Sequence, residues 1–357
     1  MNCAPLCNAI PSSKLEHLPA YTLCQSAMGE SISAELAGIA RNPVPSGAAP
    51  GIMMARDGVS VRFCLWTRTA EKRLGTVCLF PGRGEFIEKY FETVSDLRRR
   101  GFAVAMMDWR GQGGSDRLLR NPRKGHVEDF SDFDGDLRQF MNDIVLPDCP
   151  APFYGMAHSM GAHILLRSAL TKVCWFDRLV LSAPMVDLTR EMTNAPLLRV
   201  YVEALVLLGF GDLFIPGGRS RPWEMAPFDD DRLTSDRLRY ERIRDVLEAA
   251  PWLGCGSPTI GWLQAASRSI MQINSLGFAP AIKVPTMIIA AGNDTVVSTR
   301  AIERFATRVK TCRHLVLAGA RHELFQERDE IRDQFWAAFD AYIPGSNRTM
   351  ADSHIGL

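Results

Sequence analysis

Long apolar runs and regularly spaced cysteines are both missing from this 357-residue sequence. No stretch reaches the ~18 uncharged apolar residues of a membrane-spanning helix, because Arg199 and Glu203 interrupt the most apolar segment. The nine cysteines form no C-x-x-C pair, which argues against a zinc site or a disulfide framework. The first residues also lack the basic start and apolar stretch of a secretory signal. We therefore expect a cytoplasmic protein, and peripheral contact with the inner face of a membrane stays open.

An excess of either charge is absent as well. The 41 Lys and Arg residues nearly balance the 40 Asp and Glu residues, so no nucleic-acid partner is expected. Two glycine-rich turns fail to complete the dinucleotide pattern G-x-G-x-x-G, because Ile87 and Asp116 occupy its last position. We expect no cofactor and no metal. The basic stretch at 117–124 is compatible with either an anionic head group or a solvated loop.

The sequence does contain an alternation of short apolar strands and amphipathic helices. A two-residue hairpin is predicted at Asp57-Gly58, and helices with glycine stops follow several of the later strands. Such alternation predicts parallel βαβ units with helices on both faces of one sheet. The apolar strands are expected within residues 75–80, 102–108, 152–158, 176–183, 284–291 and 314–320. Ligand chemistry in a sheet of this kind gathers at the carboxyl ends of its strands.

One connection far exceeds the about 2–6 residues of an ordinary loop in such folds. Residues 188–280, called the insertion below, contain an apolar helix around 196–209 and are interpreted as a helical lid over the strand ends. Residues 1–50 are expected to form a loosely structured N-terminal extension. A single domain is expected over 51–345, followed by a flexible tail at 346–357.

The segment "YGMAHSMGAH" has the form of a nucleophilic serine on a tight turn between a strand and a helix. Ser159 stands on the turn, and the chains on either side of it approach closely enough to require small residues. Gly161 is one such residue, whereas Ala157 stands where these turns usually carry their first glycine. The alternative interpretation is a serine that caps the helix.

Two further residues complete the pattern of a catalytic triad. Asp294 ends an apolar strand, and His322 follows the next strand in a loop of small residues. Taken separately, they can be a turn aspartate and a surface histidine. Together with Ser159 they have the residue types, chain order and strand-end positions of a Ser-Asp-His hydrolase, and the triad is therefore favoured. The remaining histidines near these motifs are interpreted as structural: His126, His158 and His163.

Ester hydrolysis also needs backbone donors for the negative oxygen of the tetrahedral intermediate. One is expected from Met160, the residue after the nucleophile. The other is expected in the turn "FPGRGE", where Pro81 has no N–H group and Arg83 is the predicted donor. The glycines of this turn can alternatively serve only to make it tight.

From about residue 50 to 343 the chain resembles the α/β-hydrolases, specifically their lysophospholipase L2 and monoacylglycerol lipase branch. The resemblance rests on "FPGRGEFIEKY", "DWRGQGGSDR", "AHSMGAH", "AGNDTVVS" and "GARHELFQE", and on residues 233–266 of the insertion. It implies an α/β-hydrolase fold with a mostly parallel central sheet, helices on both faces and a helical lid inserted before the acid-bearing strand.

The same resemblance implies Ser159 as nucleophile, His322 as base and Asp294 as the residue that orients it. Arg83 and Met160 are implied as the oxyanion donors. The sequence departs from the family at Pro81, where a histidine is usual, and at the elbow alanine.

These observations predict a serine hydrolase that cleaves a lipid ester through an acyl-enzyme, with a lysophospholipid or a monoacylglycerol as substrate. A short-chain carboxylesterase or an acyltransferase on the same scaffold is the first alternative. A catalytically silent binding protein of hydrolase-like fold is the second. The oligomeric state stays open.

Overall fold

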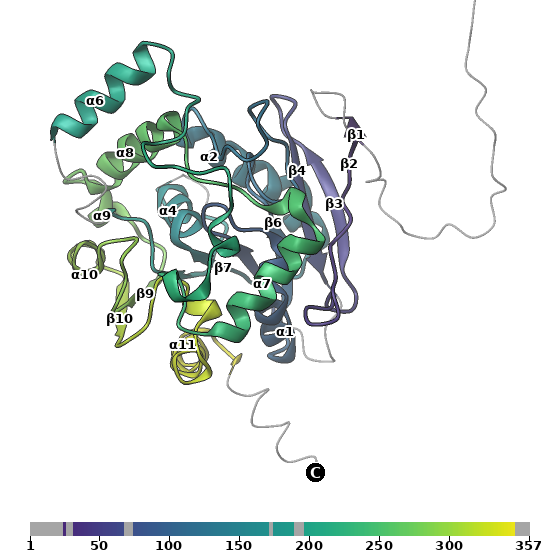
Figure 1. The fold of residues 1–357 in the computed structure, drawn as a ribbon. Coiled ribbons are helices and arrows are strands. Elements are labelled where there is room, and N and C mark those ends of the chain that lie inside the picture. The colour runs from purple at the N-terminus through teal and green to yellow at the C-terminus, as the bar shows by residue number, and fades with distance from the viewer. Residues whose placement is uncertain (1–23, 26–30, 68–73, 171–173, 189–195, 347–357) are drawn as a thin grey trace, which may run out of the picture.

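A computed structural model describes the chain in five ranges. They are residues 24–25, 31–67, 74–170, 174–188 and 196–346. An eight-stranded sheet forms the centre of the molecule, and helices cover both of its faces (Figure 1). A separate two-stranded ribbon, β1 (Cys24–Gln25) and β2 (Ser31–Ile32), lies near the N-terminus.

The strands of the central sheet follow the order β10-β9-β8-β7-β5-β6-β4-β3. Their bounds are Ala49–Met54 for β3, Ser60–Trp66 for β4, Thr76–Phe80 for β5, Ala103–Met107 for β6, Phe153–His158 for β7, Arg178–Ser182 for β8, Thr286–Ala291 for β9 and Cys312–Leu317 for β10. The pairs from β6 to β10 are parallel, whereas β4 is antiparallel to both β3 and β6. A hairpin joins β3 and β4 as predicted, but its loop has three residues, 56–58, in place of the predicted two, because the Ala55 N–H donates to Val59 O at 2.8 Å. Gly58 ends this loop with a positive φ of 85°.

Ten α-helices are described in these ranges, and several are joined by short 3₁₀ turns. The α-helices are α1 (Phe91–Arg99), α2 (Phe130–Gln139), α3 (Leu146–Asp148), α4 (Ser159–Ser168), α6 (Pro196–Leu207), α7 (Arg237–Ala249), α8 (Ile260–Asn274), α9 (Phe278–Ala281), α10 (Thr299–Ala306) and α11 (Asp329–Tyr342). Helix α2 continues as a π-helical turn over Phe140–Val145. None of the described helices has the length and apolarity needed to cross a bilayer.

Alternate side chains of a strand point to opposite faces of its sheet, and the sheet therefore separates two cores. In β5, Cys78 and Phe80 join one core, whereas Val77 and Leu79 join the other. Side chains of α2, α4, α8 and α10 complete the first core, and those of α1 and α11 complete the second. The predicted arrangement of helices on both faces is confirmed.

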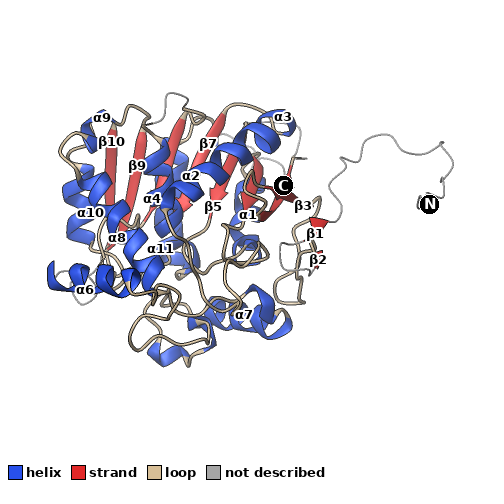
Figure 2. Cartoon of the chain, turned by 90° about the horizontal axis from the view of Figure 1, so that it is seen from above, coloured by secondary structure: helices blue, strands red, loops and turns tan. Residues whose placement is uncertain are grey.

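The insertion lies beyond one end of the sheet, where Figure 2 shows α6 and α7. Loop residues of the main domain contact it there, as in the bond between His126 Nδ1 and Thr259 Oγ1 at 2.7 Å. Thr259 also caps α8 by accepting the N–H of Trp262. The beginning of the insertion, residues 189–195, falls outside the described residues.

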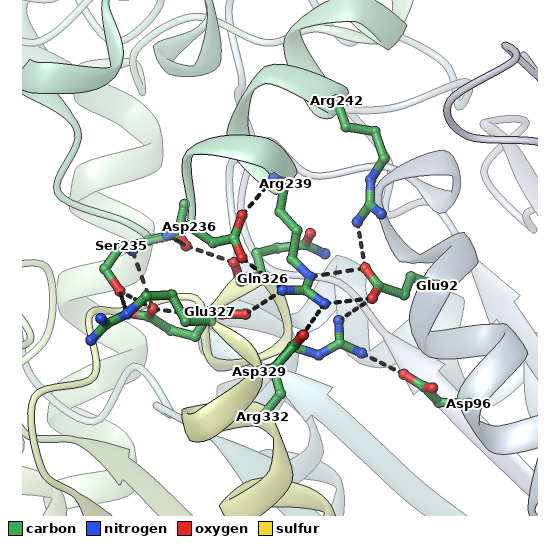
Figure 3. A network of polar contacts seen from close by, with 12 residues as sticks. Glu92, Asp96, Ser235, Asp236, Arg239, Arg242, Gln326, Glu327, Asp329 and Arg332 are labelled. Atoms are coloured by element: carbon green, nitrogen blue, oxygen red, sulfur yellow. Dashed lines mark hydrogen bonds and ion pairs between the residues drawn. The ribbon is translucent and has the colours of Figure 1, made fainter.

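A network of arginines and carboxylates joins α7 to the main domain (Figure 3). Glu92 on α1 accepts from Arg239 at 2.7 Å and from Arg242 at 2.6 Å. The same carboxylate pairs with Arg332 of α11 at 2.8 Å, and Arg239 also reaches Asp329 at 2.7 Å. Ion pairs that share Glu92 therefore hold together α1, α7 and α11, which are far apart in the sequence.

The predicted N-terminal extension is described only from residue 31 onward, apart from β1. Asn42 donates from its amide to the backbone oxygen of Glu88 at 2.9 Å, and the Trp66 indole donates to Pro45 O at 3.2 Å. Residues 1–23 and 26–30, and the tail from 347 to 357, lie outside the described residues. The domain bounds stay a prediction.

Candidate active site

Ser159 lies at the first position of α4, directly after β7, with a backbone φ of 48°. Positive φ is unfavourable for a residue with a Cβ atom, and strained residues of this kind are concentrated at functional sites. Gly161 allows the turn to close, because a Cβ there would lie 2.5 Å from Pro81 O and 2.8 Å from Phe80 O. The strained turn forms with Ala157 before it, buried in β7.

His322 lies within hydrogen-bonding distance of both of the other predicted triad residues. His322 Nε2 is 3.0 Å from Ser159 Oγ, and His322 Nδ1 is 2.7 Å from Asp294 Oδ2. The other carboxylate oxygen of Asp294 accepts the N–H groups of Val296 at 2.8 Å and Val297 at 2.9 Å. Because β9 and β10 are parallel neighbours, the loops after them bring the acid and the histidine together.

The electrostatic surroundings suit a histidine that accepts a proton. Burial alone would lower the pKa of His322, but the charge of Asp294 and the hydrogen bond to it outweigh burial and raise this pKa above its ordinary value. Burial would raise the pKa of Asp294, whereas His322 and the two backbone donors lower it further than burial raises it. Asp294 is therefore held as a carboxylate that keeps the Nδ1 proton of His322 in place.

The other two histidines near the elbow make contacts of a structural kind. The ring of His158 lies 4.6 Å from the ring of His322 between centroids, and its Nδ1 is 3.3 Å from Ser182 Oγ. Burial lowers the pKa of His158 to about 3, so it packs against the triad as a neutral ring. His163 is buried beneath the elbow and bonds Ser269 Oγ at 2.6 Å.

The turn at residues 81–85 is held in one shape by several side chains. The N–H of Gly82 donates to the Glu85 carboxylate, and the N–H of Gly84 donates to Gln112 Oε1 at 2.9 Å. Gln112 donates in return to Gly82 O at 2.7 Å. The backbone N–H between these two, that of Arg83, has no acceptor within the described part of the chain.

This turn also lies against the nucleophile elbow. A Cβ on Gly82 would come within 3.0 Å of His158 Cδ2, and Trp109 Nε1 donates to Pro81 O at 2.9 Å. Met160 is the second residue of α4, and an N–H in the first turn of a helix has no partner within that helix. These contacts are compatible with Arg83 and Met160 as backbone donors near Ser159, an assignment that stays a prediction.

The motif "DWRGQGGSD" has an architectural basis. Asp108 accepts from Arg62 Nε at 2.8 Å and from the N–H of Gly114 at 2.7 Å. A side chain on Gly113 would lie 2.3 Å from the Asp108 carboxyl carbon, so the turn needs glycine there. This turn positions Gln112 against the turn at residues 81–85.

A buried cluster of charges beside the triad was not anticipated from the sequence. Lys89 Nζ lies 2.6 Å from Glu323, 3.1 Å from Glu85 and 3.2 Å from Glu224 of the insertion. Burial raises the pKa of Glu323 to about 8, although the positive charge of Lys89 acts to lower it. The i,i+4 spacing of Glu85 and Lys89 and the adjacency of Glu323 to His322 were the only signals available in the sequence.

Candidate metal ligands were searched for in the described residues. No group of three or more His, Cys, Asp or Glu side chains there is arranged to hold a metal ion.

Comparison with known proteins places the chain among hydrolases. The model of the family described as serine aminopeptidase, S33, matches residues 71–329. Lysophospholipase L2 of Escherichia coli strain K12 is 34% identical over 302 residues, which cover 82% of this chain and 85% of the relative.

Two solved structures share the fold at lower identity. A soluble variant of monoglyceride lipase from Saccharomyces cerevisiae matches with a TM-score of 0.64 at 17% identity, covering 85% of this chain and 96% of that one. A carboxyl esterase from Bacillus coagulans matches with a TM-score of 0.66 at 21% identity, covering 84% and 99%. Together with the sheet order, these likenesses establish an α/β-hydrolase fold.

Proposed function

The chain belongs to the serine aminopeptidase S33 family of α/β-hydrolases, and we propose that it is a serine ester hydrolase that releases fatty acid from lysophospholipids or monoacylglycerols. Support for the chemistry comes from the continuous contacts from Ser159 through His322 to Asp294. Support for the substrate comes from the relative named lysophospholipase L2 and from the fold shared with a monoglyceride lipase.

Acylation begins when Ser159 Oγ attacks the ester carbonyl carbon and His322 Nε2 takes the hydroxyl proton. The carbonyl oxygen becomes negative in the tetrahedral intermediate and accepts the N–H groups of Met160 and Arg83. His322 then returns its proton to the departing glycerol oxygen, and the acyl chain stays on Ser159.

Deacylation repeats the steps of acylation with water as the attacking group. His322 takes a proton from water, the resulting oxygen attacks the acyl carbon, and the fatty acid leaves as Ser159 regains its proton. Asp294 stays ionised throughout and stabilises the imidazolium that forms in each half-reaction.

The insertion serves as the lid over this site. Trp262 of α8 lies against the Arg83 guanidinium, with 5.2 Å from its carbon to the ring centroid. The carboxylate of Glu224 reaches Lys89 beside the triad. A cover that contacts the catalytic loops in this way shelters an acyl chain from water.

A comparison of chain lengths tests the lipid substrate. We expect kcat/KM for oleoyl esters of glycerol and glycerophosphocholine to exceed that for p-nitrophenyl acetate. Because p-nitrophenol is a better leaving group than glycerol, p-nitrophenyl oleate is measured as well, so that acyl chains are also compared on the same leaving group. Each buried methylene contributes about 0.8 kcal/mol, so a sheltered chain gives a steep dependence on length. A preference for acetyl over long-chain esters would instead identify a short-chain carboxylesterase, and fatty-acid transfer to an added alcohol in place of release would identify an acyltransferase.

Contact with a lipid surface is proposed for α6 and the turn that follows it. Val200, Leu207 and Leu208 have exposed fractions of 67%, 86% and 70%, and Phe210 has 45%. Large apolar side chains gathered at one exposed place are typical of interaction surfaces.

Replacing both Leu207 and Leu208 by Asp tests this contact. We expect binding to phosphatidylcholine vesicles in co-sedimentation to fall at least about tenfold, since each leucine contributes about 1.5–3 kcal/mol when it leaves water. Leu238→Asp, on α7 and 69% exposed, is the matched control. Equal losses in the two proteins would contradict a specific role for α6.

A further inference from the structure

The Arg83 side chain is a cation beside the candidate active site without a carboxylate partner. One of its terminal nitrogens, Nη2, donates to the backbone oxygen of Gly256 at 2.7 Å, and its guanidinium carbon lies over the Trp262 ring. Its Nε is buried and has no hydrogen-bond partner. No acidic side chain in the described ranges forms an ion pair with it.

Two cations that are more deeply buried than the half-buried Arg83 are paired. Lys89 lies within 3.2 Å of three carboxylates, and Arg62 lies 2.7 Å from Glu88 and 2.6 Å from Asp108. A charge withdrawn from water is costly unless it has a partner. Burial lowers the pKa of Arg83 below its ordinary value, and the more distant Cys255 and Glu224 oppose this shift without cancelling it.

Two further arginines also donate to backbone oxygens of the insertion near Gly256, and their role is to hold the insertion in place. Arg117 donates to Trp252 O at 2.7 Å, and Arg123 donates to Pro251 O at 2.6 Å. Both bonds are at exposed positions. These residues belong to the basic stretch at 117–124, whose side chains therefore serve partly as structural donors.

The position of Arg83 suits an anion close to the ester. Its backbone N–H is a candidate oxyanion donor, so its side chain begins at the reacting carbonyl. In a lysophospholipid the phosphate is one glycerol unit away from the ester, whereas a monoacylglycerol carries an uncharged hydroxyl there. A guanidinium without an ion-pair partner matches phosphate oxygens in geometry and charge.

From these contacts we propose that Arg83 binds the phosphate of a lysophospholipid head group and makes the enzyme selective for lysophospholipids over monoacylglycerols. The inference rests on the proposed ester hydrolase function and narrows its substrate.

The test compares two substrates with the same acyl chain, 1-oleoyl lysophosphatidylcholine and 1-monooleoylglycerol, for the full-length wild type and Arg83→Met. The ratio of their kcat/KM values is the readout, because any disturbance of the shared chemistry cancels in it. We expect Arg83→Met to lower this ratio roughly 10- to 100-fold, as for the loss of a hydrogen bond to a charged group. Arg83→Lys, which keeps the charge, should lose less than Arg83→Met.

Arg123→Met is the matched control for fastening of the insertion. This substitution removes a donor to residues 251–254 of the insertion but keeps the unpaired charge of Arg83. We therefore expect it to leave the ratio of the two kcat/KM values unchanged. A fall of the ratio in Arg123→Met equal to that in Arg83→Met would overturn the assignment of Arg83, as would an unchanged ratio in Arg83→Met or a wild type that prefers monooleoylglycerol.

Inorganic phosphate at millimolar concentration distinguishes a lipid head group from a free anion. Strong inhibition of monooleoylglycerol hydrolysis that Arg83→Met relieves would assign the site to free phosphate and overturn the head-group role. Absence of inhibition supports the lipid. If the wild type cleaves neither ester, the proposed function itself fails, and the inference fails with it.

Discussion

Replacing Ser159 by alanine is expected to lower kcat for ester hydrolysis by about 10⁴- to 10⁶-fold, the range found when a triad nucleophile is removed. The physical reason is that, among the described residues, Ser159 Oγ alone is hydrogen-bonded to His322 Nε2 and able to attack the carbonyl carbon. Alanine also has a Cβ and meets the φ of 48° at a similar cost, so the fold should persist. Fatty-acid release from monooleoylglycerol measures the effect, and the thermal unfolding midpoint checks the fold.

Labelling with a fluorophosphonate adds an independent readout of the same serine. The wild type should be labelled stoichiometrically and Ser159→Ala not at all. Ser168→Ala is the matched control, because its hydroxyl lies on the same helix and donates to Leu165 O at 2.8 Å. A wild type that neither labels nor turns over ester would identify a silent binding protein, and full activity in Ser159→Ala would exclude this serine as nucleophile.

Replacing Asp294 by asparagine is expected to lower kcat about 10⁴-fold, as in other triads where the acid is lost, and to move the pH profile. His322 must be neutral to accept a proton, so kcat/KM of the wild type rises as pH rises through the His322 pKa. That acid limb should lie above the ordinary pKa of 6.5, because Asp294 raises the pKa against burial. Asparagine removes the negative charge, burial then dominates, and the limb should move to lower pH.

The dependence of kcat/KM on pH from about 5 to 9 measures this change, a range that spans ordinary histidine titration. Asp177→Asn is the control, since Asp177 Oδ2 accepts the N–H of Phe153 at the opposite, amino end of the strands. An acid limb that stays at the same pH in Asp294→Asn would show that the carboxylate does not set the pKa of His322.

Patterns that depend on neighbours in the sequence were predictable. The strands, the hairpin at Asp57-Gly58 and the strand-end positions of Asp294 and His322 follow from periodicity and turn chemistry, which are local properties. Chain order then sufficed to propose which residues meet, because parallel neighbouring strands end at the same edge of a sheet.

Charges that meet across the fold were not predictable. Lys89 and Glu323 lie 2.6 Å apart although 234 positions separate them, and nothing local to either residue indicates the other. The same holds for the Arg83 side chain, which the sequence suggested only for its backbone N–H. Its lack of a carboxylate partner depends on which loops of the insertion pass over it, and a single sequence does not contain that information.

The network around Glu92 limits how readily the insertion can be exchanged for that of another protein. Arg239 and Arg242 of α7 neutralise a carboxylate of the main domain that Arg332 shares. A hydrolase core grafted with a foreign lid would leave Glu92 with one cation in place of three. Exchange of lids between relatives, in the laboratory or in evolution, therefore requires that the incoming helix bring cations matched to α1.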